Sequence, residues 1–274
     1  ALCHDGRIGK IKRATCSIGG APAGGPFKKT SPPDELNWEV WLGQTPVVDY
    51  IEQRGDQNFR WWYEYSGGKM TDWGAHHVDI AQWAIGMDDS GPTTIDPVSF
   101  KLPQELRKGM PTKDDCYNTA TEFEIKCTFP NGSELLITDV RRGAAWDGWN
   151  DPNNGIYFEG EKGNFFVNRS GWAGKAIDEL KTKPLPVALL KKLRKGKRQS
   201  SHMANFMACV KDRSTPISDV ESHHRALTTC HLANIAIRLG RKLTWDPVAQ
   251  QIVGDDEANS WLSRPQRAGY EVEG

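Results

Sequence analysis

The sequence lacks an excess of either charge, because its 274 residues contain 35 lysines and arginines and 35 aspartates and glutamates. A neutral chain has no overall field that attracts nucleic acid or an anionic membrane. No apolar run approaches the length of a membrane span, and none of the six cysteines forms a C-x-x-C pair. A disulfide framework and a thiolate zinc site are therefore not indicated, and the chain is long enough to bury a large core as one domain.

The one basic cluster, residues 181–198, contains eight lysines and arginines. Two prolines interrupt the cluster and no aromatic residue lies within it, whereas surfaces that bind nucleic acid combine a basic stripe with a recognisable motif. We therefore interpret it as a solvated surface and expect neither a nucleic-acid partner nor a membrane span.

The segment 67–83 carries the clearest chemical pattern, since two glycines precede a stretch with helical character. Positions i and i+4 of a helix lie on one face, so Asp72 and His76 are expected to meet at hydrogen-bond range, and Asp79 and Trp83 continue the stripe. A carboxylate beside an imidazole favours removal of a proton from a hydroxyl group. The alternative from spacing alone is that His76 is a satisfied histidine at a buried helix start.

Tryptophan is abundant, with 11 residues. Indole rings offer flat apolar faces to sugar rings, and the ring N–H bonds hydroxyl groups. About half of these residues are expected in the core, because large aromatic side chains are usually well buried. Four lie in irregular surroundings and are candidates for lining a site: Trp61, Trp62, Trp146 and Trp149.

The periodicity predicts several elements. A helix is expected from 72 to 85, and two more are expected from 201 to 211 and from 219 to 239. Alternating apolar and polar residues predict a strand over 119–129, and Asn131-Gly132 predicts a hairpin turn after it. Further strands are expected at three places: residues 7–18, 134–140, and a second hairpin over 156–168. Hairpins with helices grouped before and after them indicate an α+β fold with a mostly antiparallel open sheet and helices packed on one face.

Residues 67–79 resemble the G-G-x-x-x-D-x-G-x-H-x-x-D signature of the glucose–fructose oxidoreductase / inositol dehydrogenase (Gfo/Idh/MocA) superfamily. The similarity extends to Arg-Trp-Trp-Tyr at 60–63 and to residues 216–225 and 239–243, which resemble the branch with a long bacterial-type C-terminal domain. Together these motifs cover nearly the whole chain.

The resemblance implies a second domain that these residues do not include. Relatives begin with a Rossmann domain, whose glycine-rich turn binds the dinucleotide and whose Glu-Lys-Pro segment supplies a lysine. The glycine cluster 19–25 has the wrong spacing and is interpreted as a loop. Residues 1–274 are thus expected to be the substrate-binding and oligomerisation C-terminal domain, with 1–10 a remnant of the junction. NAD or NADP would be bound mainly by the missing domain, and this chain alone would be inactive.

The resemblance also implies roles for individual side chains. His76 would take the hydroxyl proton of a sugar or polyol, and Asp72 would orient His76 or relay the proton. Arg60 would help to hold the substrate, together with Trp61, Trp62 and Trp146, and His77 is a further candidate. No cofactor-binding residue of this chain is identified. The family pattern also predicts a homo-oligomer formed through the open sheet face.

Three alternatives stay open at this stage. Some relatives use transient oxidation by tightly held NAD to cleave a glycosidic bond, with the same Asp/His pair. The chain could instead be a non-catalytic sugar-binding or scaffold module. The pairs His76-His77 and His223-His224 raise a metal-dependent hydrolase, but no H-E-x-x-H motif is present and no metal ligand is assigned. The sugar, the choice of NAD or NADP, and a cytoplasmic or periplasmic location are not determined by the sequence.

Overall fold

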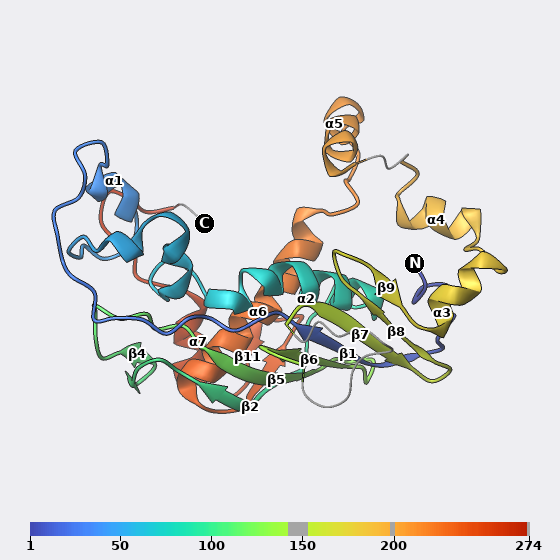
Figure 1. Ribbon diagram of the computed structural model, residues 1–274, viewed down its shortest axis with the longest axis horizontal. Helices are drawn as coiled ribbons and strands as arrows, with labels where there is room; N and C mark the ends of the chain where they lie inside the picture. Colours follow the sequence, from blue (N-terminus) through green and yellow to red (C-terminus); the bar gives the residue numbers. More distant parts are fainter. Residues whose placement is uncertain (142–152, 198–200, 273–274) are drawn as a thin grey trace.

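The computed structural model describes residues 1–141, 153–197 and 201–272. Within them, nine strands form one sheet in the order β11-β10-β2-β5-β6-β1-β7-β8-β9 (Figure 1). β1 pairs with β6 in parallel, and the other neighbouring pairs are antiparallel. The strands are β1 (Ile11–Ser17), β2 (Thr94–Lys101), β5 (Glu122–Thr128), β6 (Glu134–Thr138), β7 (Gly155–Gly160), β8 (Asn164–Val167), β9 (Trp172–Ala173), β10 (Leu243–Asp246) and β11 (Gln251–Ile252).

The alternation in β5 separates the two faces of the sheet. Phe123, Ile125 and Cys127 are buried in the main core, while the residues between them are partly or fully exposed. The predicted hairpin turn is confirmed, since Gly132 has a φ of +83° and the Asn131 side chain accepts a hydrogen bond from the Ser133 N–H at 2.9 Å. The turn returns the chain as β6, so both strands present an apolar face to the same side.

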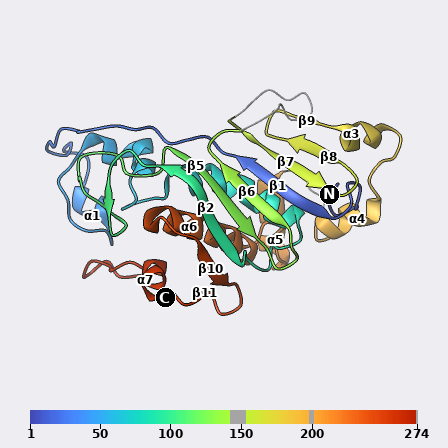
Figure 2. The same ribbon diagram turned by 90° about the horizontal axis from the view of Figure 1, so that it is seen from below.

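Helices α2 (Trp73–Ala84) and α6 (Val220–Leu239) cover that face of the sheet (Figure 1). Figure 2 shows the other face, where the strands lie in front of the two helices. The Asp219 side chain caps α6 by accepting the Ser222 N–H, and Gly240 ends it in the left-handed conformation, with a φ of 65°. The predicted α+β fold, with helices on one face of a mostly antiparallel sheet, is confirmed.

The remaining elements are short. They are α1 (Trp38–Leu42), the two-stranded pair β3 (Leu106–Arg107) and β4 (Met110–Pro111), α3 (Lys175–Asp178), α4 (Val187–Leu193), α5 (His202–Asp212), α7 (Asp256–Asn259) and five 3₁₀ turns, η1 (Glu52–Arg54), η2 (Asp56–Trp61), η3 (Gly68–Met70), η4 (Glu179–Lys181) and η5 (Ser260–Leu262). α4 and α5 extend away from the sheet on its helix side (Figure 1). None of the helices in the described residues is long and apolar enough to cross a membrane.

A second, smaller core lies beside the N-terminus of α2 and contains Trp62, which is wholly buried. The Arg54 guanidinium lies 4.1 Å from the centroid of the Trp62 ring. Arg54 also donates to the Tyr65 hydroxyl at 2.7 Å and to the Asp114 carbonyl at 2.6 Å. Hydrogen bonds and the aromatic face thus compensate the burial of this cation.

The chain after β1 passes so close to the segment before β5 that a side chain at Gly20 has no room. A Cβ atom there would lie 2.2 Å from the Thr121 carbonyl oxygen, which is backbone and not free to move aside. We expect Gly20→Ala to lower the free energy of unfolding by about 2–3 kcal/mol, measured by urea denaturation.

The matched control is Gly55→Ala, where the nearest atom to an added Cβ is 3.6 Å away. This change should alter the stability by less than about 0.5 kcal/mol. Equal losses in the two variants would contradict the close approach at Gly20.

Candidate functional site

Two glycines place the start of α2 against neighbouring segments. An added Cβ at Gly67 would lie 2.4 Å from Nδ2 of Asn234, and one at Gly68 would lie 2.7 Å from the Thr119 side chain. Asn234 donates a hydrogen bond to the Gly67 carbonyl at 2.9 Å. The Gly-Gly pair is therefore explained by close packing of Gly67 on α6 and of Gly68 on Thr119, which fixes where α2 begins.

Asp72 is the N-cap residue of α2, but its side chain caps no backbone N–H. Its Oδ2 lies 3.4 Å from Nη1 of Arg60 and 3.5 Å from Nζ of Lys69. Over the part of the chain that the structure describes, no hydrogen bond joins Asp72 to His76. The expected contact is therefore not formed in this conformation: the Asp72 carboxylate contacts the two cations, and the Asp72 backbone, with ψ of −87°, departs from helical values.

Trp61 lies beneath the same two cations. The Arg60 guanidinium is 5.1 Å and the Lys69 ammonium 5.5 Å from the centroid of its ring. Trp61 itself is 7% exposed, so the largely buried ring supports the two cations. We name Arg60, Trp61, Lys69 and Asp72 the cationic cluster. Lys69 is its one member that the sequence did not suggest.

His76 lies on the first turn of α2 and lines a cavity of about 580 Å³. Residues of α2, α4, α5, the first turn of α6 and the segment before it line the cavity. Its polar lining includes His76, Asp79, Arg169, His202, Ser218 and His223. Trp83, Leu190 and Leu193 add apolar surface. We call this space the His76 cavity; it combines acid–base groups with apolar walls, as binding sites commonly do.

Asp79 and His223 approach each other across the His76 cavity. The closest atoms are Oδ1 of Asp79 and Nδ1 of His223, at 4.0 Å. Burial raises the pKa of Asp79, and the neighbouring His223 opposes this rise. The Ser218 hydroxyl and Nε2 of His223 form a hydrogen bond. No local sequence pattern predicts this contact, because Asp79 and His223 lie on different helices.

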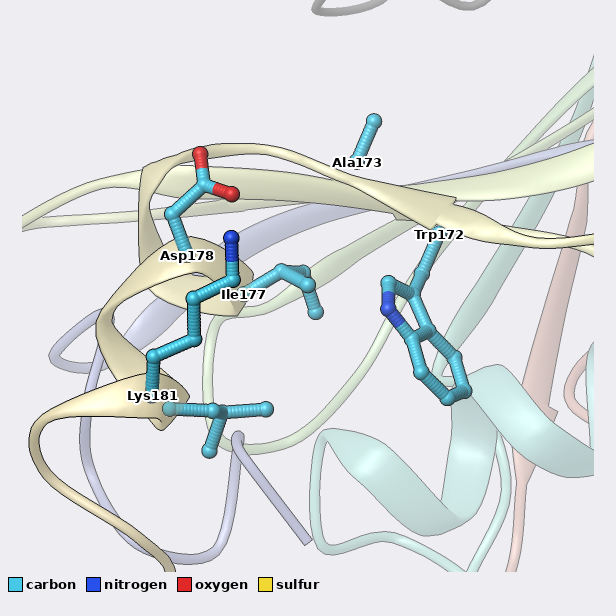
Figure 3. A pocket seen from close by; sticks show the side chains of 6 residues that line it. Trp172, Ala173, Ile177, Asp178 and Lys181 are labelled. Atoms are coloured by element: carbon cyan, nitrogen blue, oxygen red, sulfur yellow. The ribbon is translucent and has the colours of Figure 1, made fainter.

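A separate pocket of about 430 Å³ lies beside β9 and α3. Trp172 of β9 and Ile177 of α3 line it, with Asp178 and Lys181 nearby (Figure 3). None of the predicted site residues lines this pocket, and we assign it no role.

His77 faces the interior, in contrast to the exposed His76. It is 2% exposed, its Nε2 lies 3.3 Å from Oδ1 of Asn154, and its Nδ1 has no partner among the described residues. Burial lowers the pKa of His77 to about 4. In this conformation His77 is a neutral packing residue with no surface for a substrate.

The predicted site residues thus divide into four groups. Arg60, Trp61 and Asp72 gather in the cationic cluster, and His76 lines the cavity. Trp62 and His77 are buried, and a ring without exposed surface offers no face to a ligand, so neither is placed in the proposed site. Trp146 and Trp149 lie outside the described residues. Throughout residues 1–141, 153–197 and 201–272, no three His, Cys, Asp or Glu side chains are grouped to hold a metal ion.

The buried His77 makes stability depend on pH. Between its ordinary pKa of 6.5 and the folded value of about 4, the unfolded chain binds a proton that the folded chain does not. The free energy of unfolding therefore falls as the pH falls through this window, by about 3 kcal/mol from this residue. Urea denaturation at several pH values should show that His77→Gln lacks this part of the dependence. If the free energy of unfolding depends on pH in the same way in the wild type and in His77→Gln, the contribution of His77 is contradicted.

Comparison with known proteins places the chain in a family. A family model described as "Oxidoreductase family, C-terminal alpha/beta domain", of the Gfo/Idh/MocA group, matches residues 25–272. No curated protein matches the sequence.

Solved structures are similar to the chain at low identity. The aldose–aldose oxidoreductase from Caulobacter crescentus is 12% identical with a TM-score of 0.49, over 89% of this chain and 58% of that one. The WlbA dehydrogenase from Bordetella pertussis is 14% identical with a TM-score of 0.48, over 89% and 57%. A putative myo-inositol dehydrogenase from Sinorhizobium meliloti is 13% identical with a TM-score of 0.43, over 88% and 59%. The chain therefore spans less than two thirds of each of these proteins.

The match to the family model covers most of the sequence, including the signature around Asp72 and His76 and both long helices. The chain belongs to the Gfo/Idh/MocA oxidoreductase family, and residues 25–272 correspond to its C-terminal α/β domain.

Proposed function

We propose that this chain is the substrate-binding domain of an NAD(P)-dependent oxidoreductase that acts on a hydroxyl group of a sugar or polyol. The observation that carries the proposal is the position of His76, exposed on the first turn of α2 and facing a cavity of about 580 Å³. An imidazole in that position is placed to accept a hydroxyl proton. Family membership supports the reaction class.

The glycine cluster 19–25 does not form a dinucleotide cradle. Such a cradle needs glycines that open toward the pyrophosphate before a helix N-terminus. Added Cβ atoms at Gly20, Gly24 and Gly25 would meet Thr121, Tyr117 and Cys116 within 3 Å, so these glycines pack against protein. We propose, as the family resemblance implies, that another domain of the intact protein binds the cofactor and supplies the catalytic lysine. The present chain alone is then expected to be inactive.

When bound, a nicotinamide dinucleotide supplies the two-electron acceptor for oxidation of the carbon. The residues of this chain would provide binding and proton transfer. His76 accepts the hydroxyl proton, and Arg60, which is partly exposed above Trp61, donates hydrogen bonds to substrate oxygens. Asp72 keeps a proposed role in orienting His76, which requires its carboxylate to turn away from Arg60 and Lys69.

The open face of the sheet supports a proposed subunit contact. It carries the ion pairs of Glu134 with Arg13 at 2.6 Å and with Lys126 at 2.5 Å, beside the half-buried Leu136 and Tyr157. We propose a homo-oligomer formed through this face, as the family resemblance implies. Sedimentation of the intact protein as a monomer at micromolar concentration would overturn this proposal.

The proposed role of His76 gives a direct test in the intact protein. His76→Asn should lower kcat for oxidation of a sugar or polyol by about 100- to 10,000-fold, because the proton acceptor is removed while a polar side chain remains. Steady-state formation of reduced nicotinamide measures the effect.

His231→Asn serves as the matched control, since His231 is an exposed histidine of α6 that does not line the His76 cavity. Its kcat should stay close to that of the wild type. Equal kcat values for the His76 variant and the control would contradict the role of His76 as proton acceptor. Cleavage of a glycoside without net reduced cofactor would instead favour the transient-oxidation mechanism.

A further inference from the structure

A series of polar side chains leads from the His76 cavity to the molecular surface. Asp79 lies one helical turn after His76 on α2, and both residues line the cavity. Nδ1 of His223 is 4.0 Å from the Asp79 carboxylate, and the other ring nitrogen of His223 is hydrogen-bonded to the Ser218 hydroxyl. The side chain of His223 is 49% exposed and Ser218 is exposed, so the outer end of this series of side chains contacts water.

We propose that Asp79, His223 and Ser218 form a proton relay that carries the proton accepted by His76 out of the cavity to solvent. The inference rests on the proposed function of His76 and deepens it. It assigns Asp79 and His223 as positioning residues for the proton, since neither is required to touch the substrate.

The charges around Asp79 favour such an exchange. Burial is the main influence on its carboxylate and disfavours the charged form, and Asp88 and Asp219 act in the same direction. His223 and His76 act against them. The cavity is also lined by other charged or titratable groups, Arg169, Arg194 and His202, and Asp219 is paired with Lys195 at 2.7 Å. A partly buried carboxylate that faces His223 and feels the charge of His76 accepts and releases a proton more readily than an exposed one.

The relay moves one proton and no electrons. The substrate O–H bond breaks as an N–H bond forms on His76, and the imidazolium then gives a proton to the Asp79 carboxylate. Asp79 gives its proton to Nδ1 of His223, in the tautomer that carries hydrogen on Nε2, after a side-chain rotation closes the 4.0 Å gap between them to hydrogen-bond range. His223 then loses its Nε2 hydrogen to water through the Ser218 hydroxyl. His76 and Asp79 return to their starting states, one proton has entered the solvent, and His223 is left with hydrogen on Nδ1, so proton exchange with water must restore its first tautomer before the next turnover.

A purely structural contact between α2 and α6 is the competing explanation for the pair of Asp79 and His223. Such a contact would stabilise the fold, but it would not link the protonation of His76 to that of Asp79, nor make turnover depend on buffer. The experiments therefore measure protonation and buffer dependence, with thermal unfolding as a check on folding.

The first experiment follows the Asp79 carboxyl carbon of the intact protein by NMR as a function of pH. Burial raises the pKa of Asp79 and the two neighbouring imidazoles oppose this rise, so His76→Asn and His223→Gln should each raise the pKa of Asp79 further. The matched control is His202→Asn, a histidine that lines the same cavity and should change the pKa of Asp79 less. An unchanged pKa of Asp79 in His76→Asn overturns the relay.

The second experiment measures turnover of the intact enzyme with His223→Gln. At low buffer concentration kcat should fall by about tenfold with KM unchanged, and added imidazole should restore it, because a small buffer can replace the missing proton carrier. A loss that imidazole does not restore, or no loss, overturns the relay. If the wild-type enzyme is active but the pKa of Asp79 does not depend on His76, the relay is excluded and the proposed function stands. If the intact protein oxidises no sugar or polyol, the proposed function is excluded as well.

Discussion

The position of the candidate site depends on the buried hydrogen bonds that join α2 to α6. The Thr229 hydroxyl donates to the Gln82 side chain at 2.9 Å, and Asn234 donates to the Gly67 carbonyl at the same distance just before α2 begins. These polar side chains are all buried, so breaking either bond would leave groups without partners away from water. Rotation or sliding of α2 is therefore unfavourable, and the direction in which His76 faces is set by the fold.

The elements that the sequence predicted correctly are those with local signals. The hairpin of β5 and β6 follows from alternation and an Asn-Gly turn, and α6 follows from its cap at Asp219 and its end at Gly240. β2 was not predicted, because Pro97 and a register shift between Pro97 and Ser99 interrupt its period. The parallel pairing of β1 with β6 joins segments more than 100 residues apart, and no local pattern specifies such a partner.

The site was predicted in part, for reasons that particular residues show. Since residues along a helix are separated by about 100°, His77 and His76 necessarily face different directions, which the sequence already implied. The pairing of Asp72 with Arg60 joins the cap of α2 to a separate segment, and spacing within the helix carries no information about it. Trp61 and Trp62 are adjacent in the chain, yet one supports the cationic cluster and the other is wholly buried against Arg54.

We propose that this domain presents a sugar or polyol hydroxyl to an acid–base residue of an oxidoreductase. The most direct measurement uses the intact protein and sugars or polyols deuterated at the carbon that bears the hydroxyl group. Deuterium should appear in the nicotinamide, and reduced cofactor should accumulate. Transfer of no deuterium to nicotinamide from any such substrate would contradict the proposed function.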